Sequence, residues 1–178
     1  GAEDAENIII LMGSATEAAR EAIDYLTSEG KKVGMISVHL YRPFSVKHLF
    51  AAVPKTVKKI AVLDRTKEPG AEGEPLYLDV KSAFYDQENR PVIVGGRYGL
   101  GSSDITPAKI ISVYNNLELP EPKNHFTVGI IDDVTFTSLP AVEEMALGGK
   151  SIYEAKFFGL GADGTVGANK NSVKIIGD

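Results

Sequence analysis

The 178-residue chain contains no cysteine. Disulfide bonds, cysteine-ligated iron–sulfur clusters and thiol catalysis are therefore excluded within it. Histidine is scarce as well: His39, His48 and His125 are scattered along the sequence, and none has a second ligand at a spacing typical of metal sites. We therefore expect this chain to hold no metal.

Long apolar runs and basic runs are also missing. No segment stays apolar over the roughly 20 residues that a membrane-spanning helix needs. The net charge is −5, which gives no indication of nucleic-acid binding. The first six residues are acidic and lack the apolar core of a secretory signal. These features predict a cytoplasmic protein with neither a membrane nor a nucleic-acid partner.

Apolar segments alternate with amphipathic ones through the first 120 residues. Buried strands are expected where β-branched and apolar residues run together between turn signals. These strands are residues 7–12, 33–40, 60–63 and 91–94. Because strands alternate with helices, the pattern predicts an α/β fold with a mostly parallel sheet and right-handed crossovers.

Four helix starts carry recognisable signals. Ser14 and Glu17 have the spacing of a capping box, in which both side chains bind free backbone N–H groups. Ser45 is a candidate N-cap for a short second helix. Pro75 and Pro107 suit the first turn of the third and fourth helices, because proline has no N–H to satisfy there.

The alternating pattern breaks at a proline-rich linker near residue 120. We expect an α/β domain over residues 1–120 and a connector over 121–150, followed by the truncated start of another domain over 151–178. The connector should contain an edge strand at 125–131 and a short helix at 141–147. The last segment should contain a strand at 155–158 followed by a helix.

The segment at residues 60–70 is the most informative. An apolar strand turns within one residue into a loop that carries Asp64, Arg65, Lys67 and Glu68. Ligands and partners meet open α/β sheets at the carboxyl ends of the strands. The residues leave two interpretations open: these side chains cap backbone groups and face water, or they contact a ligand or partner.

Two glycine-rich segments carry the same ambiguity. Residues 159–164 have the form G-x-G-x-x-G between a predicted strand and a predicted helix, which suits either a tight turn or phosphate binding at the helix N-terminus. The full dinucleotide fingerprint needs a further strand, and Asp163 would repel a phosphate. Residues 95–101 form a second glycine-rich loop, with Arg97 as its only cation, which is either a turn or an anion contact.

Long runs of the sequence resemble pyruvate:ferredoxin (flavodoxin) oxidoreductases, a family of large thiamine-dependent 2-oxoacid enzymes. The similarity covers nearly the whole chain. The runs that carry it are YRPFS at 41–45, IAVLDRTKEPG at 60–70, GEPLY at 73–77, GRYGLG at 96–101 and FGLGADGTVGANK at 158–170.

The resemblance implies a three-layer α/β/α sandwich similar to a transketolase C-terminal domain, followed by the start of a gamma-type domain. The first strand should then lie between the second and the third. The whole enzyme would oxidise pyruvate with CoA to acetyl-CoA and CO2, using thiamine diphosphate, Mg2+ and 4Fe–4S clusters held outside this chain. Its partners would be the remaining domains, a second copy in a homodimer, and ferredoxin or flavodoxin.

Within such an enzyme we expect this chain to be a noncatalytic structural and assembly domain, inactive alone and without a catalytic residue. Its interface residues would be Asp64, Arg65, Lys67, Glu68 and Arg97. An alternative is a CoA- or nucleotide-binding module. The residues that would serve it are Gly159, Gly161, Gly164, Thr165, Asn169 and Lys170. An unrelated flavodoxin-like regulatory domain is a third interpretation.

Overall fold

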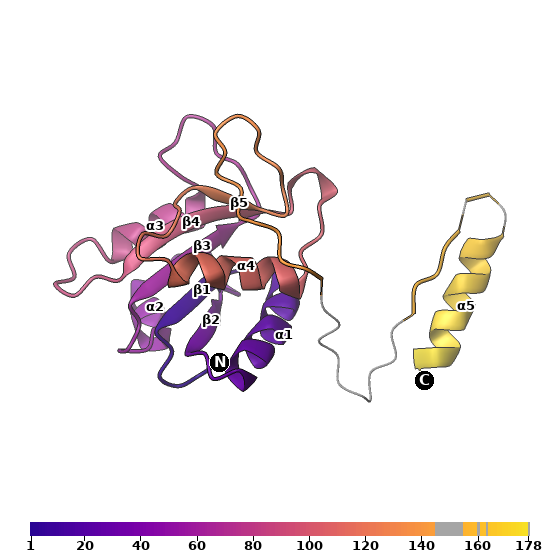
Figure 1. The fold of residues 1–178 in the computed structure, drawn as a ribbon, viewed down its shortest axis with the longest axis horizontal. Coiled ribbons are helices and arrows are strands. Elements are labelled where there is room, and N and C mark those ends of the chain that lie inside the picture. The colour runs from indigo at the N-terminus through magenta and orange to yellow at the C-terminus, as the bar shows by residue number, and fades with distance from the viewer. Residues whose placement is uncertain (145–154, 160, 163, 178) are drawn as a thin grey trace. The chain divides into compact units, whose positions relative to one another are not determined.

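The computed structural model describes residues 1–144, 155–159, 161, 162 and 164–177 (Figure 1). The chain divides into two compact units, Gly1–Leu147 and Gly148–Asp178. The first unit contains the sheet and the helices that cover it. In the second unit the described secondary structure is the helix α5, Thr165–Gly177.

The first unit is built on a five-stranded parallel sheet with the order β2-β1-β3-β4-β5. The strands are β1 Asn7–Leu11, β2 Val33–Ser37, β3 Lys59–Asp64, β4 Val92–Tyr98 and β5 Phe126–Val128. Strand β1 lies between β2 and β3, which confirms the predicted order. Its residues Ile8 to Leu11 are buried, as their continuous apolar sequence requires of a strand covered on both faces.

Helices cover both faces of the sheet. The helices are α1 Ala15–Ser28, α2 Val46–Ala52, α3 Pro75–Ala83 and α4 Pro107–Glu118, with a short 3-10 helix at Leu100–Ser102. Helices α1 and α4 pack into one apolar core, on the face of Ile9 and Leu11. Helices α2 and α3 form the opposite core with Ile8 and Ile10. The three-layer α/β/α sandwich expected from the sequence is confirmed.

The predicted caps have mixed outcomes. The Ser45 hydroxyl accepts a backbone N–H bond at the start of α2, as expected. The Thr106 hydroxyl, for which no cap was predicted, does the same at the start of α4. The capping box at Ser14 is wrong: Ser14 has helical angles, φ −63° and ψ −21°, and no capping bond from its side chain. A capping side chain needs an extended backbone at that position. Instead, the Thr16 hydroxyl donates to the Gly13 carbonyl at 2.8 Å.

Strand β4 is longer than predicted because it includes Gly95 and Gly96, which the sequence indicated to be loop. Each glycine leaves room for an aromatic ring from a neighbouring element. A Cβ on Gly95 would lie 2.8 Å from the Tyr77 ring, and one on Gly96 would lie 2.2 Å from the Phe126 ring. Both glycines therefore serve close packing inside a strand, a known use of glycine in sheets.

Other predicted boundaries also shift. Strand β2 ends at Ser37, three residues before its expected end, and the edge strand β5 is shorter than residues 125–131. Residues 155–158 are not a strand, since no described segment pairs with them and a strand needs a hydrogen-bonding partner. Of the helix expected at 141–147, residues 141–144 are not helical, and the rest lies outside the described residues.

Candidate functional site

Asp64 is the last residue of β3, at the carboxyl edge of the sheet. Its side chain turns into the domain, where Oδ1 accepts the backbone N–H of Leu76 and Oδ2 that of Tyr77, both at 3.1 Å. These are first-turn N–H groups of α3, which has no helical partner for them. The N-cap residue Glu74 makes no capping bond of its own. Asp64 therefore caps α3 from a distance in the sequence.

The surroundings of Asp64 oppose its ionisation. Only 6% of the residue is exposed. Burial raises the pKa of the carboxyl above its ordinary value, although the two backbone N–H bonds act in the lowering direction. The carboxylates of Glu74 and Asp79 raise it further. Asp64 thus caps backbone groups, as one interpretation of the sequence held, but it does not face water.

Arg97 lies in β4 and not in a loop, which corrects the expected glycine-rich loop at 95–101. It stands beside Asp64 in the β3–β4 register. Its Nη1 lies 3.6 Å from Oε1 of the buried Glu74, so the two side chains form an ion pair beneath the loop after β3. The buried Nε atom has no hydrogen-bond partner among the described residues. Most of the Arg97 side chain is therefore enclosed by its own domain.

The remaining charged residues of this loop face outward. Arg65 is exposed, and its Nε donates to the Gly99 carbonyl at 3.2 Å, which joins the loops after β3 and β4. Lys67 and Glu68 are exposed and form no side-chain hydrogen bond or ion pair with the described part of the chain. Of the five predicted interface residues, Arg65, Lys67 and Glu68 are thus free to meet another surface. The interface role of all five stays a prediction.

A polar cluster that sequence reasoning did not single out joins the loop after β2 to helix α3. The Tyr41 hydroxyl donates to Oδ2 of Asp79 at 2.6 Å, and Nη1 of Arg42 reaches the same oxygen at 2.7 Å. The Arg42 guanidinium also stacks over the Tyr41 ring. Burial, followed by the bond to Asp79, raises the pKa of Tyr41 to about 12. This hydroxyl is therefore a hydrogen-bond donor at neutral pH.

These elements enclose a hollow at the switch point of the sheet. The chain leaves β1 for α1 on one face and leaves β3 for α3 on the other face, so the two loops diverge between neighbouring strands. The residues that line the hollow are Met12, Gly13, Ser14, Tyr41, Asp64, Arg65, Thr66, Pro75 and Tyr98. The set contains no histidine and no pair of a nucleophile with a base. The hollow therefore lacks the groups of a complete acid–base or nucleophilic site.

The second unit brings several of the predicted ligand residues together. Gly159, Asn169 and Lys170 line one hollow against α5. A Cβ on Gly159 would lie 2.8 Å from the Thr165 hydroxyl, and Nδ2 of Asn169 donates to the Phe158 carbonyl at 3.3 Å. Gly161 and Gly164 have φ near +80° and form the turn, as glycine allows. Asp163 lies outside the described residues.

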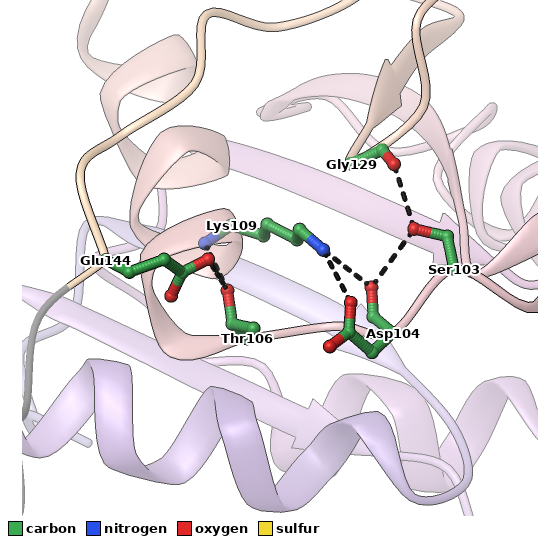
Figure 2. A network of polar contacts seen from close by, with 6 residues as sticks. All are labelled: Ser103, Asp104, Thr106, Lys109, Gly129 and Glu144. Atoms are coloured by element: carbon green, nitrogen blue, oxygen red, sulfur yellow. Dashed lines mark hydrogen bonds and ion pairs between the residues drawn. The ribbon is translucent and has the colours of Figure 1, made fainter. Parts of the chain in front are cut away.

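A second polar network ties down the end of the first unit (Figure 2). The Ser103 hydroxyl donates to the Gly129 carbonyl at 2.9 Å, and Nζ of Lys109 reaches Oδ1 of Asp104 at 2.8 Å. The Thr106 hydroxyl donates to Oε1 of Glu144 at 2.8 Å. The start of α4 thus holds both the loop after β5 and the chain shortly before the second unit. Ser103 and Gly129, like Thr106 and Glu144, are far apart in sequence, so no local pattern could have indicated these two bonds.

Among the described residues, no group of three or more histidine or acidic side chains could hold a metal ion. Within the same part of the chain, no helix is both long enough and apolar enough to cross a membrane.

The parallel sheet with helices on both faces defines a class, the open α/β sandwich, in which ligands and partners commonly meet the carboxyl edge of the sheet. Within this class, residues 5–110 match the family model of pyruvate:ferredoxin oxidoreductase core domain II. The chain therefore belongs to the pyruvate:ferredoxin oxidoreductase family.

Curated relatives match the whole chain. A pyruvate-flavodoxin oxidoreductase of Enterobacter agglomerans is 60% identical over 179 residues, and a pyruvate:ferredoxin oxidoreductase of Moorella thermoacetica is 54% identical over 178 residues. The chain spans 15% of the length of each. Among solved structures, a 2-oxoglutarate:ferredoxin oxidoreductase from Magnetococcus marinus, with 2-oxoglutarate, coenzyme A and succinyl-CoA bound, is 26% identical with a TM-score of 0.47. The match covers 62% of this chain and 17% of that one.

Proposed function

We propose that this chain is the core domain II portion of a whole enzyme that converts pyruvate and CoA to acetyl-CoA and CO2 and reduces ferredoxin or flavodoxin. Within that enzyme the chain serves as a noncatalytic structural and assembly domain. The observation that carries the proposal is the family match over residues 5–110, together with a carboxyl edge whose buried Asp64 is committed to holding α3.

The cofactor chemistry belongs to other parts of that enzyme. Thiamine diphosphate with Mg2+ would supply the carbanion chemistry, and 4Fe–4S clusters would carry the electrons. This chain has no cysteine to ligate such clusters. Since the chain spans 15% of its relatives, the remaining length offers room for both sites. A cytoplasmic homodimer is part of the same proposal.

Arg65, Lys67 and Glu68 are the residues best placed to contact the neighbouring domains, because their side chains face outward at the switch-point edge. In the full-length enzyme, the double variant Arg65→Glu and Lys67→Glu should reduce the assembled fraction in analytical ultracentrifugation. The activity of each assembled molecule should be retained. Lys55→Glu, a charge reversal on the exposed loop before β3, is the control and should change neither quantity. Full assembly of the double variant would contradict the proposal.

The alternative function, a CoA- or nucleotide-binding module, is favoured by one observation: Gly159, Asn169 and Lys170 line the same hollow in the second unit. Lysine would supply charge to a phosphate, and the glycine would allow close approach of the backbone. The amide of Asn169 is used partly within the turn, through its bond to Phe158. This alternative concerns the second unit and is compatible with a structural role of the first.

Calorimetry on the full-length enzyme tests the alternative. Lys170→Ala and Asn169→Ala should each weaken CoA binding, while Lys156→Ala, an exposed lysine in the segment before the turn, should leave it unchanged. Unchanged CoA affinity in both test variants would leave residues 159–170 as a structural turn. Titration of the 178-residue chain with CoA, thiamine diphosphate and NAD, followed by thermal shift, separates CoA recognition from general nucleotide binding.

A further inference from the structure

The switch-point hollow has an uneven set of hydrogen-bonding groups on its walls, and its principal acceptors are already used within the domain. The Met12 carbonyl accepts the Tyr98 hydroxyl at 3.2 Å. The Gly13 carbonyl accepts both the N–H and the hydroxyl of Thr16, at 3.1 and 2.8 Å. The two carboxylate oxygens of Asp64 hold backbone N–H groups of α3. These acceptors are therefore engaged before any ligand arrives.

The donors on the same walls are unused. The hydroxyl groups of Ser14 and Thr66, which both line the hollow, form no side-chain hydrogen bond with any residue that the structure describes. The Arg65 guanidinium uses Nε alone, which donates to the Gly99 carbonyl at 3.2 Å. Within the described part of the chain, its two Nη atoms stay available. Unused donors beside a positive charge favour a ligand that brings acceptor atoms.

Arg65 is held in place for such a contact. A Cβ on Gly99 would lie 2.8 Å from Nε and 3.2 Å from Cδ of Arg65, so only a glycine lets this side chain lie against the loop after β4. Burial raises the pKa of Tyr98, and the Arg65 charge acts on it in the lowering direction, which places that charge near the Tyr98 hydroxyl on the wall of the hollow. A cation positioned in advance loses less conformational entropy when it binds an anion.

The neighbouring charges leave that of Arg65 unmatched. Arg42 and Asp79 pair with each other, with Nη1 and Oδ2 2.7 Å apart. Among the described residues that line the hollow, Asp64 alone is acidic. Its side chain turns into the domain, and burial raises its pKa, which opposes its negative charge. The hollow therefore favours an anion over a cation.

The rest of the lining limits what this anion can be. The hollow has a volume of about 350 Å³, at the lower end of the range for small-molecule sites. Met12, Pro75 and the ring of Tyr41 supply apolar surface, which suits a carbon skeleton. The two Nη atoms of a guanidinium match the two oxygens of one carboxylate. Both properties together describe an organic acid.

We propose that the switch-point hollow is a binding site for a small organic acid. Arg65 and the hydroxyl groups of Ser14 and Thr66 bind its carboxylate. Met12 and Pro75 contact its short apolar part. The site needs only the 178-residue chain, so it goes beyond the proposed assembly role and does not depend on it.

Titration of the 178-residue chain with sodium butyrate, followed by proton–nitrogen NMR spectra, tests the site. Butyrate carries a carboxylate on a short apolar chain, and butyramide is its neutral counterpart of nearly the same shape. When butyrate replaces chloride at constant ionic strength, the amide signals of Gly13, Ser14 and Thr66 should shift and saturate, with roughly millimolar affinity. Butyramide should bind about tenfold more weakly, because it cannot form a charge-assisted bond with Arg65.

Two variants assign the contacts. Arg65→Gln removes the charge and should weaken butyrate binding about tenfold. Ser14→Ala removes a hydroxyl that makes no capping bond and should weaken it about threefold. Lys67→Gln, which removes an exposed charge from the same loop but outside the lining of the hollow, is the control and should leave the affinity unchanged. Unshifted signals of the buried strand residues show that each variant is folded.

The other outcomes would overturn the proposal. Shifts that grow without saturating, or that saturate only at residues away from the hollow, would show that no such site exists. Equal affinities for butyrate and butyramide would leave an apolar hollow without recognition of an acid. Equal losses in Arg65→Gln and Lys67→Gln would reduce the effect to general electrostatic attraction. None of these results would alter the assembly measurement on the full-length enzyme, so the site and the proposed function fail separately.

Discussion

The carboxylate of Asp64 at the end of β3 accepts the backbone N–H of Leu76, the second residue of α3, at 3.1 Å. The two residues are twelve positions apart, and the charged loop between them carries Arg65, Lys67 and Glu68. The bond closes that loop and fixes the start of α3 against the sheet. The exposed charged side chains therefore lie on a loop whose two ends are joined by the buried carboxylate of Asp64.

Replacing Asp64 by alanine should destabilise the domain. The N–H groups of Leu76 and Tyr77 would lose their acceptor in a buried place, at a cost of about 1–3 kcal/mol for each group. Urea unfolding should show the loss, and hydrogen exchange should accelerate at these two amides. Asp86→Ala, which removes an exposed carboxylate after α3, is the control. Equal unfolding midpoints for the two variants would refute the capping role.

The pH dependence of stability should contain a contribution from Asp64. Burial raises its pKa in the folded state above the ordinary 3.8. The linked stabilisation is therefore complete below that ordinary pKa and is lost as pH rises through the raised one. Asp64→Asn cannot titrate, so its free energy of unfolding should fall less than that of the wild type between about pH 4 and pH 7. If the free energy of unfolding falls equally with pH in both proteins, Asp64 makes no such contribution.

Gly96→Ala should destabilise the sheet, because the added methyl group would meet the ring of the fully buried Phe126. Overpacking of this kind costs about 1–3 kcal/mol. Gly167→Ala is the matched control, since nothing lies within 4 Å of a Cβ at that helical position. Thermal unfolding followed by circular dichroism should show a lower transition for Gly96→Ala alone. An unchanged transition temperature would mean that Phe126 and β5 move to make room for the methyl group without loss of stability.

Phe136→Gly should not destabilise the 178-residue chain, because Phe136 is 74% exposed and has a left-handed backbone with φ +56°. Glycine relieves a conformation that costs a bulky residue roughly 1–2 kcal/mol, so the melting temperature should stay equal or rise. Differential scanning calorimetry provides the measurement. A fall in the isolated chain would show that the ring stabilises its own domain.

The 178-residue chain alone should not oxidise pyruvate, even with thiamine diphosphate, CoA and an electron acceptor. It has no cysteine for a cluster, and the switch-point hollow has no pair of a nucleophile with a base. Reduction of methyl viologen can be followed by its absorbance. A rate above that of a protein-free control would disprove this expectation.

Local sequence patterns were sufficient for the parallel sheet and for most helices. Strand β1 was recognisable because its apolar run needs cover on both faces, and α3 and α4 because Pro75 and Pro107 suit a first turn. The resemblance supplied the position of β1 between β2 and β3. The confirmed features of the fold were therefore predicted either from short-range sequence patterns or from the resemblance to a known family.

The misplaced features depend on partners far away in the sequence. Gly95 and Gly96 belong to a strand because Tyr77 and Phe126 fill the space above them. Asp64 is buried because α3 begins eleven residues later, at Pro75, without a capping side chain of its own. No contact was predicted for Asp132, which binds the hydroxyl groups of Thr135 and Thr137, three and five residues later. Its exposed apolar neighbours gave no periodic signal.

The position of β1 also has a consequence for synthesis on the ribosome. Of the five strands of this sheet, β1 is made first, yet it reaches its second neighbour only when β3 has been made, after α1, β2 and α2. At about 5–20 residues per second this interval lasts several seconds, during which Ile8 to Leu11 lack one of their two neighbouring strands. A nascent chain halted before residue 59 would thus carry an exposed apolar strand that invites chaperone binding, and release of β3 ends that exposure.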